Sequence, residues 1–251
     1  MGKIIAVVNQ KGGVGKTTTA VNLTAALHDL GLKVLMCDFD PQANATSGLG
    51  IEKRNIKSSV YDVIINGTDA HSAVISTKFG DVLPACADLA GAGVELVGME
   101  NPHYCLSAAL ESLRGEYDVI FIDCPPSLEM LTLNALAAAD GILVPVQCEY
   151  YALEGLSDLM STMRMVKKRI NPELEIFGVV LTMFDGRTNF STQVAQEVRR
   201  HFPGKVCSAV IPRNIRLAEA PSHGLPVTAY DRSSKGAVAY KAVAEELKTK
   251  L

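Results

Sequence analysis

A glycine-rich loop near the N-terminus constrains this chain more than any other feature. Residues 4–8 are apolar, and the sequence NQKGGVGKTTT follows directly at positions 9–19. A polyphosphate needs several backbone N–H groups close together, and side chains at Cβ would block that approach. Three glycines in the loop lack such side chains: Gly12, Gly13 and Gly15. With a strand before it and a helix from about Thr17 after it, the loop is predicted to be a nucleotide-binding P-loop.

The loop departs from the ordinary P-loop in one respect. The ordinary pattern has a glycine five residues before Gly15, but Gln10 stands there and Lys11 lies beside it. Lys16 is expected to reach the β and γ phosphates, and the Thr17 hydroxyl is expected to bind Mg²⁺. A second lysine is superfluous for one phosphate site but useful for a neighbouring one. The sequence therefore predicts a deviant P-loop.

Short β-branched runs alternate with longer segments that carry apolar residues at helical spacing. Besides the first strand, the runs expected to be strands are 33–37, 119–122, 141–146, 176–181 and 206–211. This alternation predicts an α/β fold with a doubly wound, mainly parallel sheet, helices on both faces and ligands at the carboxyl ends of the strands. The chain has 48% apolar residues and no repeat or obvious linker, so residues 1–251 are expected to form a single domain.

Charge is distributed unevenly along the chain. Residues 1–159 hold 9 Lys and Arg against 19 Asp and Glu, whereas residues 160–251 hold 15 against 8, and the net charge is −3. A basic C-terminal third can form a positive face for phosphate backbones, or it can be a solvated surface without a partner.

Other features exclude several classes of protein. No apolar run approaches the ~20 residues of a membrane span, and the N-terminus lacks the form of a secretory signal. The six cysteines show neither a Cys-x-x-Cys pair nor metal-finger spacing. We expect a cytoplasmic protein without disulfides, a zinc site or a membrane partner.

Carboxylates follow two of the expected strands. Asp123 closes an apolar strand, which is the Walker B arrangement for holding Mg²⁺ through its water shell. Asp38 and Asp40 close another and put a carboxylate within reach of an attacking water. Phosphoryl-transfer chemistry needs both functions at the edge of the sheet where the P-loop lies.

Four segments together resemble the ParA/Soj family of chromosome and plasmid partition ATPases. They are KGGVGKTT at 11–18, DFDPQANAT at 38–46, DCPPS at 123–127 and IPRNIRLAEAP at 211–221. The resemblance covers nearly the whole chain. The P-loop and the D-x-D are shared by the wider deviant Walker superfamily, including MinD and the nitrogenase iron protein. The segment 147–155 and the Pro-Arg-Asn stretch look more specific to the Soj-like branch.

The resemblance implies a homodimer in which two ATP molecules are sandwiched between the subunits. Lys11 would reach across to the partner's phosphates during transfer, and Asp40 would position or activate the attacking water. With Lys16, these form the expected catalytic set. ATP is inferred from the family, because a P-loop does not distinguish adenine from guanine.

The same resemblance extends the nucleotide and metal sites. Thr17 and, through water, Asp123 would hold Mg²⁺, and Asp38 would have a supporting role around the metal. The nucleotide-binding residues would be Lys11, Gly12, Gly13, Val14, Gly15, Lys16, Thr17 and Thr18 in the loop, with Pro212 and Asn214 at the adenine.

Members of this family bind double-stranded DNA without sequence preference when ATP-bound, and a ParB-like centromere-binding protein stimulates hydrolysis. The resemblance therefore implies both partners and an association with the nucleoid. Arg187 and Arg216 match the positions that the resemblance points to for DNA contact.

Two alternative functions follow from the wider superfamily. A MinD-like membrane-cycling ATPase would need an amphipathic C-terminal helix, but residues 239–251 lack bulky apolar residues on a long face and are more typical of a docked helix. An iron–sulfur carrier ATPase would use paired cysteines such as Cys86 and Cys124, but the residues that flank them do not resemble the nitrogenase pattern.

Overall fold

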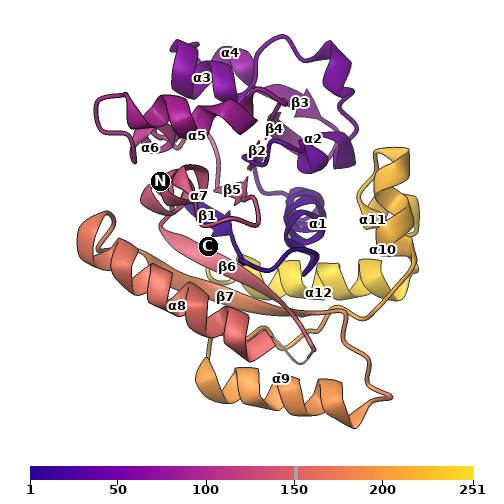
Figure 1. The fold of residues 1–251 in the computed structure, drawn as a ribbon. Coiled ribbons are helices and arrows are strands. Elements are labelled where there is room, and N and C mark those ends of the chain that lie inside the picture. The colour runs from indigo at the N-terminus through magenta and orange to yellow at the C-terminus, as the bar shows by residue number, and fades with distance from the viewer. Residues whose placement is uncertain (150–151) are drawn as a thin grey trace.

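A central sheet carries the predicted loop at the carboxyl ends of its strands. The computed structural model describes residues 1–149 and 152–251, and the side chains of all of these except 152–154. Part of the segment 147–155 therefore lies outside the described residues. Over the described ranges the sheet has seven strands in the order β3-β4-β2-β5-β1-β6-β7 (Figure 1). Their bounds are β1 Lys3–Val7, β2 Val34–Asp38, β3 Ile75–Thr77, β4 Gly80–Leu83, β5 Val119–Asp123, β6 Gly141–Gln147 and β7 Glu175–Thr182.

The pairings in the sheet are parallel except at one edge. Among the strands of the described residues, only β3 runs antiparallel, against β4. The registers bring the ends of β1, β2 and β5 level, since Val7 and Asp38 both pair with Asp123. The fold confirms the predicted α/β class. It also confirms the expected strands at 33–37, 119–122, 141–146 and 176–181.

Helices cover both faces of this sheet (Figure 1). The longer helices are α1 Lys16–Asp29, α5 Leu89–Val97, α7 Met130–Ala138, α8 Ala152–Arg169, α9 Asn189–His201 and α12 Lys235–Lys248. The shorter ones are α2 Asn44–Gly48, α3 Val60–Asn66, α4 Ala70–Ala73, α6 Cys105–Glu111, α10 Arg216–Glu219 and α11 Val227–Tyr230, with 3-10 turns at Lys53–Asn55 and Ala220–His223.

Alternate side chains of the strands enter two separate cores. In β1, Ile4 and Ala6 belong to the core that includes residues of α3 to α9, whereas Ile5 and Val7 belong to the core that includes residues of α1 and α12. A strand that is buried on both faces reads as a continuous apolar run, and this explains the run at 4–8.

One expected strand is wrong. Residues 206–211 run beside β7 as an irregular neighbour: Val206 forms an isolated bridge with Val179, and Pro212, just beyond, forms one with Phe184, which follows β7. The Cys207 amide donates to the Val179 carbonyl at 2.9 Å, but the next amide, that of Ser208, donates to Glu246 of α12 at 2.8 Å. The Leu181 carbonyl of β7 then accepts from the Ile211 amide at 2.8 Å, so four residues of the segment pass alongside two of β7 and the ladder is interrupted.

The helix near the C-terminus is docked, as the sequence predicts. Its buried residues, which include Ala237, Tyr240, Ala244 and Leu247, recur at helical spacing. They pack against α1, where the hydroxyl oxygens of Tyr240 and Thr19 lie 3.0 Å apart. In the described part of the chain, no helix has the length and apolar character needed to cross a membrane.

Candidate nucleotide-binding site

The glycine-rich loop links the end of β1 to the start of α1. Gly13 and Gly15 have φ angles of 75° and 92°, in the left-handed region that disfavours other residues. A Cβ on Gly13 would meet no atom within 4 Å, and on Gly15 only the Thr182 Cγ2 at 3.8 Å. Backbone conformation, rather than lack of space, therefore requires these glycines. A Cβ on Gly12 would also meet no atom within 4 Å, and its φ is not positive, so its backbone simply faces open space.

A buried side chain and a hydrogen bond to β7 also hold the loop in place. Val14 is buried, and its carbonyl accepts a hydrogen bond from the Thr182 hydroxyl at 2.8 Å. Thr182 ends β7, so the loop is attached to a strand two positions away in the sheet. This attachment holds the cradle in shape before any nucleotide binds.

Lys16, the first residue of α1, lies inside the cradle and is only 7% exposed. Its ammonium donates to the Lys11 carbonyl at 3.2 Å and forms no ion pair among the residues that the structure describes. Burial lowers the pKa of Lys16, and the nearby Asp123 opposes that shift. A desolvated cation without a bound carboxylate is suited to receive a phosphate.

Two carboxylates lie at the ends of neighbouring strands, as the sequence predicts. Asp38 and Asp123 are both completely buried. The Asp38 Oδ2 accepts hydrogen bonds from the amide and the hydroxyl of Thr46, both at 2.7 Å, and its Oδ1 accepts one from the Asp40 amide at 3.3 Å. Burial raises the pKa of Asp38 to about 6, in spite of these hydrogen bonds. Asp38 is thus held in place by its neighbours.

Asp123 differs because neither of its carboxyl oxygens has a well-formed hydrogen bond to a described residue. Burial, and after it the charge of Asp38, raises the pKa of Asp123 well above its usual range, while the Thr17 side chain acts in the opposite direction. Buried carboxylate oxygens that lack a well-formed hydrogen bond, next to a threonine hydroxyl, are the hard oxygen ligands that Mg²⁺ prefers. Thr17 and Asp123 therefore fit the ion.

Asp40 lies just beyond β2 and is partly exposed. Its Oδ1 accepts a hydrogen bond from the Gln42 amide at 2.9 Å, which fixes the carboxylate in a tight turn. Its charge contributes to the electrostatic environment of Lys16. The carboxylate is therefore near the phosphate cradle and accessible to water.

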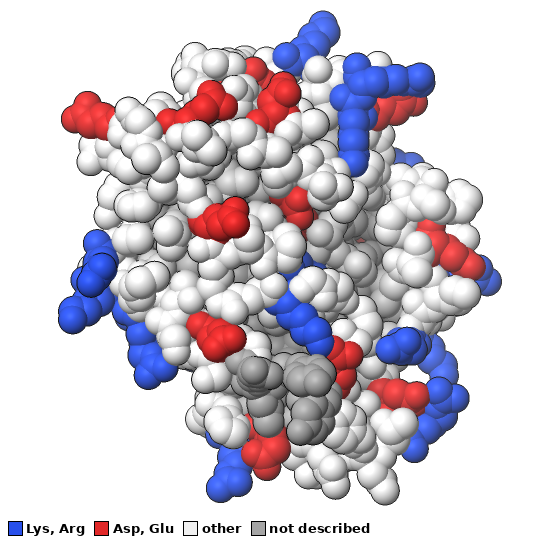
Figure 2. Space-filling model, viewed as in Figure 1, with Lys and Arg blue, Asp and Glu red and all other residues white. Residues whose placement is uncertain are grey.

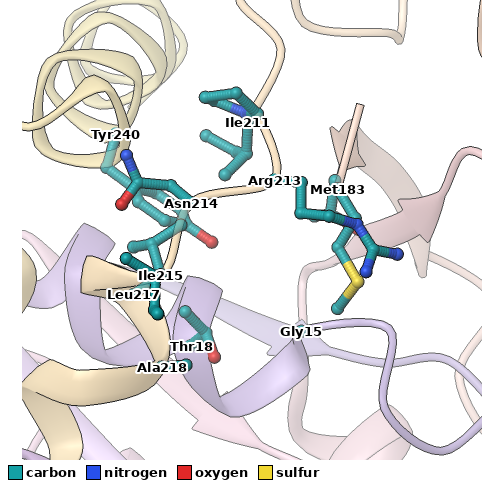
Figure 3. Close-up of a pocket in the computed structure, with 12 residues that line it drawn as sticks. Gly15, Thr18, Met183, Ile211, Arg213, Asn214, Ile215, Leu217, Ala218 and Tyr240 are labelled. Carbon is teal, nitrogen blue, oxygen red and sulfur yellow. The ribbon is translucent and has the colours of Figure 1, made fainter. Parts of the chain in front are cut away.

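A cavity of about 330 Å³ opens beside the loop. Gly15 and Thr18 line it together with Pro212 and Asn214, the two residues that the resemblance assigns to the adenine. Figure 3 shows Met183 and Arg213 on one side of this cavity and Ile215, Leu217 and Ala218 on the other. Apolar walls with a few polar groups are typical of pockets for small molecules, including planar bases.

Several lining residues are not found by sequence reasoning: Thr182, Met183, Ile211, Ile215, Leu217 and Tyr240. Thr182 directly follows the expected strand 176–181, so its position at a carboxyl end was an available signal. Met183 has a φ of 49°, a left-handed value that is uncommon for a side chain of this size and is found at functional sites. Nothing in the sequence indicates that Tyr240 reaches this cavity.

Lys11 occupies the outer side of the loop. Its side chain is 33% exposed and forms an ion pair with Glu149, which follows β6. Sequence reasoning placed Lys11 in the site but did not identify Glu149. The two lysines of the loop therefore have different surroundings, one inside the cradle and one at its rim.

The two arginines expected at DNA lie outside the cavity lining. Arg187 is 89% exposed and binds Asp185 through two hydrogen bonds of 2.9 and 2.7 Å, which lower the pKa of Asp185 to about 2. Arg216 lies 2.8 Å from Glu219 and 3.4 Å from Asp231. Each arginine is paired with acidic residues of its own subunit. Figure 2 likewise shows Lys and Arg at separated places on one face, with Asp and Glu between them.

Comparison with known proteins agrees with this geometry. Residues 2–176 match the family model described as an AAA domain. Over 249 residues the chain is 54% identical to the sporulation initiation inhibitor protein Soj of Bacillus subtilis (strain 168), covering 98% of each protein. It is 51% identical over 249 residues to the chromosome partitioning protein ParA of Myxococcus xanthus (strain DK1622), covering 98% of this chain and 88% of that protein.

A solved structure is similar in fold and carries a nucleotide. Cobyrinic acid a,c-diamide synthase from Mycobacterium smegmatis, with bound ADP and magnesium, matches with a TM-score of 0.86 and 38% identity, covering 99% of this chain and 94% of that one. The fold is thus that of a nucleotide-binding protein, and the curated relatives share half of the sequence over nearly its full length. The chain belongs to the ParA/Soj family of chromosome partitioning ATPases.

Proposed function

We propose that this chain is a DNA segregation ATPase that forms an ATP-sandwich dimer. The dimer binds double-stranded DNA without sequence preference, and a ParB-like centromere-binding protein stimulates hydrolysis. The proposal rests on the different positions and exposures of the two loop lysines. Lys16 is 7% exposed within the cradle, whereas the Lys11 side chain is 33% exposed at its rim. Lys16 suits the subunit's own phosphates, and Lys11 suits those of a second subunit.

The reaction would be hydrolysis of the bond to the γ phosphate by water. Lys16 and the loop amides would bind the phosphates and stabilise the charge that develops on them. Asp40, fixed by the Gln42 amide, would orient the attacking water or accept its proton. Thr17 and, through water, Asp123 would hold Mg²⁺, which would supply charge neutralisation at the phosphates. Lys11 of the second subunit would complete the arrangement.

Adenine would occupy the apolar cavity beside the loop. Pro212 supplies an apolar surface there, and the orientation of Asn214 is fixed because its Oδ1 accepts a hydrogen bond from the Arg216 amide at 2.8 Å. The magnesium and ADP in the similar solved structure support this assignment. The preference for adenine itself rests on the family.

DNA binding would use Arg187 and Arg216 on the assembled dimer. Dimerisation doubles the number of such arginines on one particle, so ATP can control DNA affinity without changing either arginine. Phosphates would replace Asp185, Glu219 and Asp231 as partners of the two guanidinium groups. The proposed activity implies association with the nucleoid, and the names of the curated relatives support a role in chromosome partitioning.

Co-sedimentation with DNA tests this proposal. The protein is mixed with duplexes of unrelated sequence, and separately with anionic liposomes, in the presence of ATP, of ADP and of no nucleotide. We expect DNA binding with ATP alone and equal binding to every duplex. ATP-dependent binding to liposomes instead of DNA would favour a MinD-like membrane cycle. Addition of a ParB-like protein to the ATP and DNA mixture should raise the hydrolysis rate.

A further inference from the structure

Lys11 is held by its own subunit at the backbone and at the side chain. Its amide donates to the Asn9 Oδ1 at 3.0 Å, and its carbonyl accepts from the Lys16 ammonium at 3.2 Å. Its own ammonium forms an ion pair with Glu149. The lysine expected to act on another subunit therefore has a defined position in the single chain.

The partners of Lys11 are themselves anchored to one strand. Asn9 is 7% exposed, and its Nδ2 donates to the Pro145 carbonyl of β6 at 2.8 Å. Glu149 comes two residues after the end of β6, and its amide donates to the Gln147 carbonyl at 2.8 Å. Strand β6 thus fixes both the backbone of Lys11 and the carboxylate that binds its side chain.

This arrangement has a consequence for dimer formation. An ammonium that is paired with a carboxylate of its own chain has its charge largely compensated, so it attracts distant phosphates weakly. We infer that Glu149 restrains Lys11 in the single subunit, and that ATP-dependent pairing of two subunits requires the Lys11–Glu149 ion pair to open. The inference rests on the proposed function, because it takes Lys11 to act on the partner's phosphates.

The size of the restraint follows from the exposure of the pair. The Lys11 and Glu149 side chains are 33% and 35% exposed, so water and salt weaken their attraction. Ion pairs of this kind alter an equilibrium constant by about two- to five-fold. Each dimer opens two such pairs, one in each subunit. The restraint therefore weakens dimerisation by about 4- to 25-fold, which is enough to set the protein concentration at which dimers appear.

Other roles for Glu149 predict a different effect of its removal on dimerisation. If Glu149 instead bound the partner's Lys11 in the dimer, its removal would weaken dimerisation. If Glu149 were only a solvated surface residue, its removal would change nothing. The sign of the effect therefore separates the three possibilities.

The test compares Glu149→Gln with wild type and with Glu173→Gln. The first variant keeps the shape of the side chain and removes its charge. The control removes an exposed carboxylate from the turn after α8, and Glu173 forms no ion pair among the described residues. Dimer dissociation constants are measured by sedimentation at saturating non-hydrolysable ATP analogue, so that differences in nucleotide affinity do not contribute. Thermal unfolding and ADP binding verify that each variant is folded.

We expect Glu149→Gln to dimerise about 4- to 25-fold more tightly than wild type, and Glu173→Gln to match wild type. The difference between Glu149→Gln and wild type should shrink as salt is raised from about 50 mM to about 500 mM. Glu149→Asp, whose shorter side chain reaches less far, serves as a second variant. Its dimer dissociation constant should fall between those of wild type and Glu149→Gln.

Two outcomes would overturn the inference alone, provided that wild type forms dimers. Either Glu149→Gln leaves the stability of the dimer unchanged, or it weakens the dimer. A wild-type protein that stays monomeric with saturating analogue would instead overturn the proposed function, and the inference with it.

Discussion

Asp38 and Asp123 are register partners at the ends of β2 and β5, and both side chains are completely buried. Burial is the main cause of the raised pKa of each carboxyl group, and the charge of Asp38 adds to the shift at Asp123. Two carboxylates in one buried place are costly to ionise together unless a cation is present. The folded chain therefore carries an electrostatic cost at this edge of the sheet that Mg²⁺ would relieve.

The raised pKa of Asp38 predicts a specific dependence of stability on pH. A carboxyl with a higher pKa in the folded than in the unfolded state stabilises the fold below its unfolded pKa and loses that contribution as pH rises through its folded pKa. For Asp38 this window runs from 3.8 to about 6. Asn at this position has no charge to bury. The stability of Asp38→Asn relative to wild type should therefore rise between about pH 4 and about pH 7, by up to about 3 kcal/mol.

Urea unfolding without nucleotide or Mg²⁺ measures this difference. Asp69→Asn is a suitable control, because its carboxyl is exposed and hydrogen bonding to His71 lowers its pKa. The control should show no rise in relative stability over the same range. A difference between Asp38→Asn and wild type that stayed constant with pH would contradict the burial argument.

The two lysines of the loop should fail in different ways. Lys16→Ala should lose nucleotide binding, because it removes the buried cation of the cradle. Lys11→Ala should still bind nucleotide but should neither dimerise productively nor hydrolyse ATP. Nucleotide affinity and the mass of the ATP-bound species are measured for both. If Lys11→Ala dimerised and turned over like wild type, the lysine would have no role across the interface.

Replacement of Asp40 should separate binding from hydrolysis. Asp40→Ala removes the carboxylate that would orient water, but it leaves the cradle and the cavity intact. The variant should bind ATP, persist as a dimer and hydrolyse about 10²- to 10⁴-fold more slowly. Steady-state turnover and dimer lifetime after dilution are the measurements. Turnover within a few-fold of wild type would reject the role of Asp40.

The arginines should affect DNA binding without affecting the dimer. Arg187→Glu and Arg216→Glu should each weaken binding equally for all sequences and flatten the dependence on salt, which has a log-log slope of about −0.9 per phosphate contacted. Arg216 is close to Asn214, so the mass of the ATP-bound dimer is measured in parallel. Intact dimers with unchanged DNA affinity in both variants would redirect the search to Arg199, Arg200 and Lys205.

Local pattern was sufficient to predict much of this fold and site. The P-loop strand and helix, the buried strands and the shared edge of Asp38 and Asp123 all follow from apolar runs and from the rule that parallel strands end together. The loop glycines followed from the requirement for close backbone approach.

The remainder depends on contacts between distant segments. The edge strand β3 and its neighbour β4 have three and four residues, too few to stand out by periodicity. The run 206–211 has strand composition, but the Leu181 carbonyl of β7 accepts from the Ile211 amide and not from that of Ala209, and this offset in register is not visible locally. The pairing of Lys11 with Glu149 likewise joins segments that only the folded sheet brings together.

The contact between Thr19 and Tyr240 bears on how the site arises during synthesis. The phosphate loop is synthesised before the walls of the neighbouring cavity, which come from residues 182–218 and from Tyr240 on α12. A nascent chain that has not yet released α12 has the loop but lacks one wall of the cavity and the helix that packs on α1. The cavity beside the loop is therefore complete only once α12 has docked on α1.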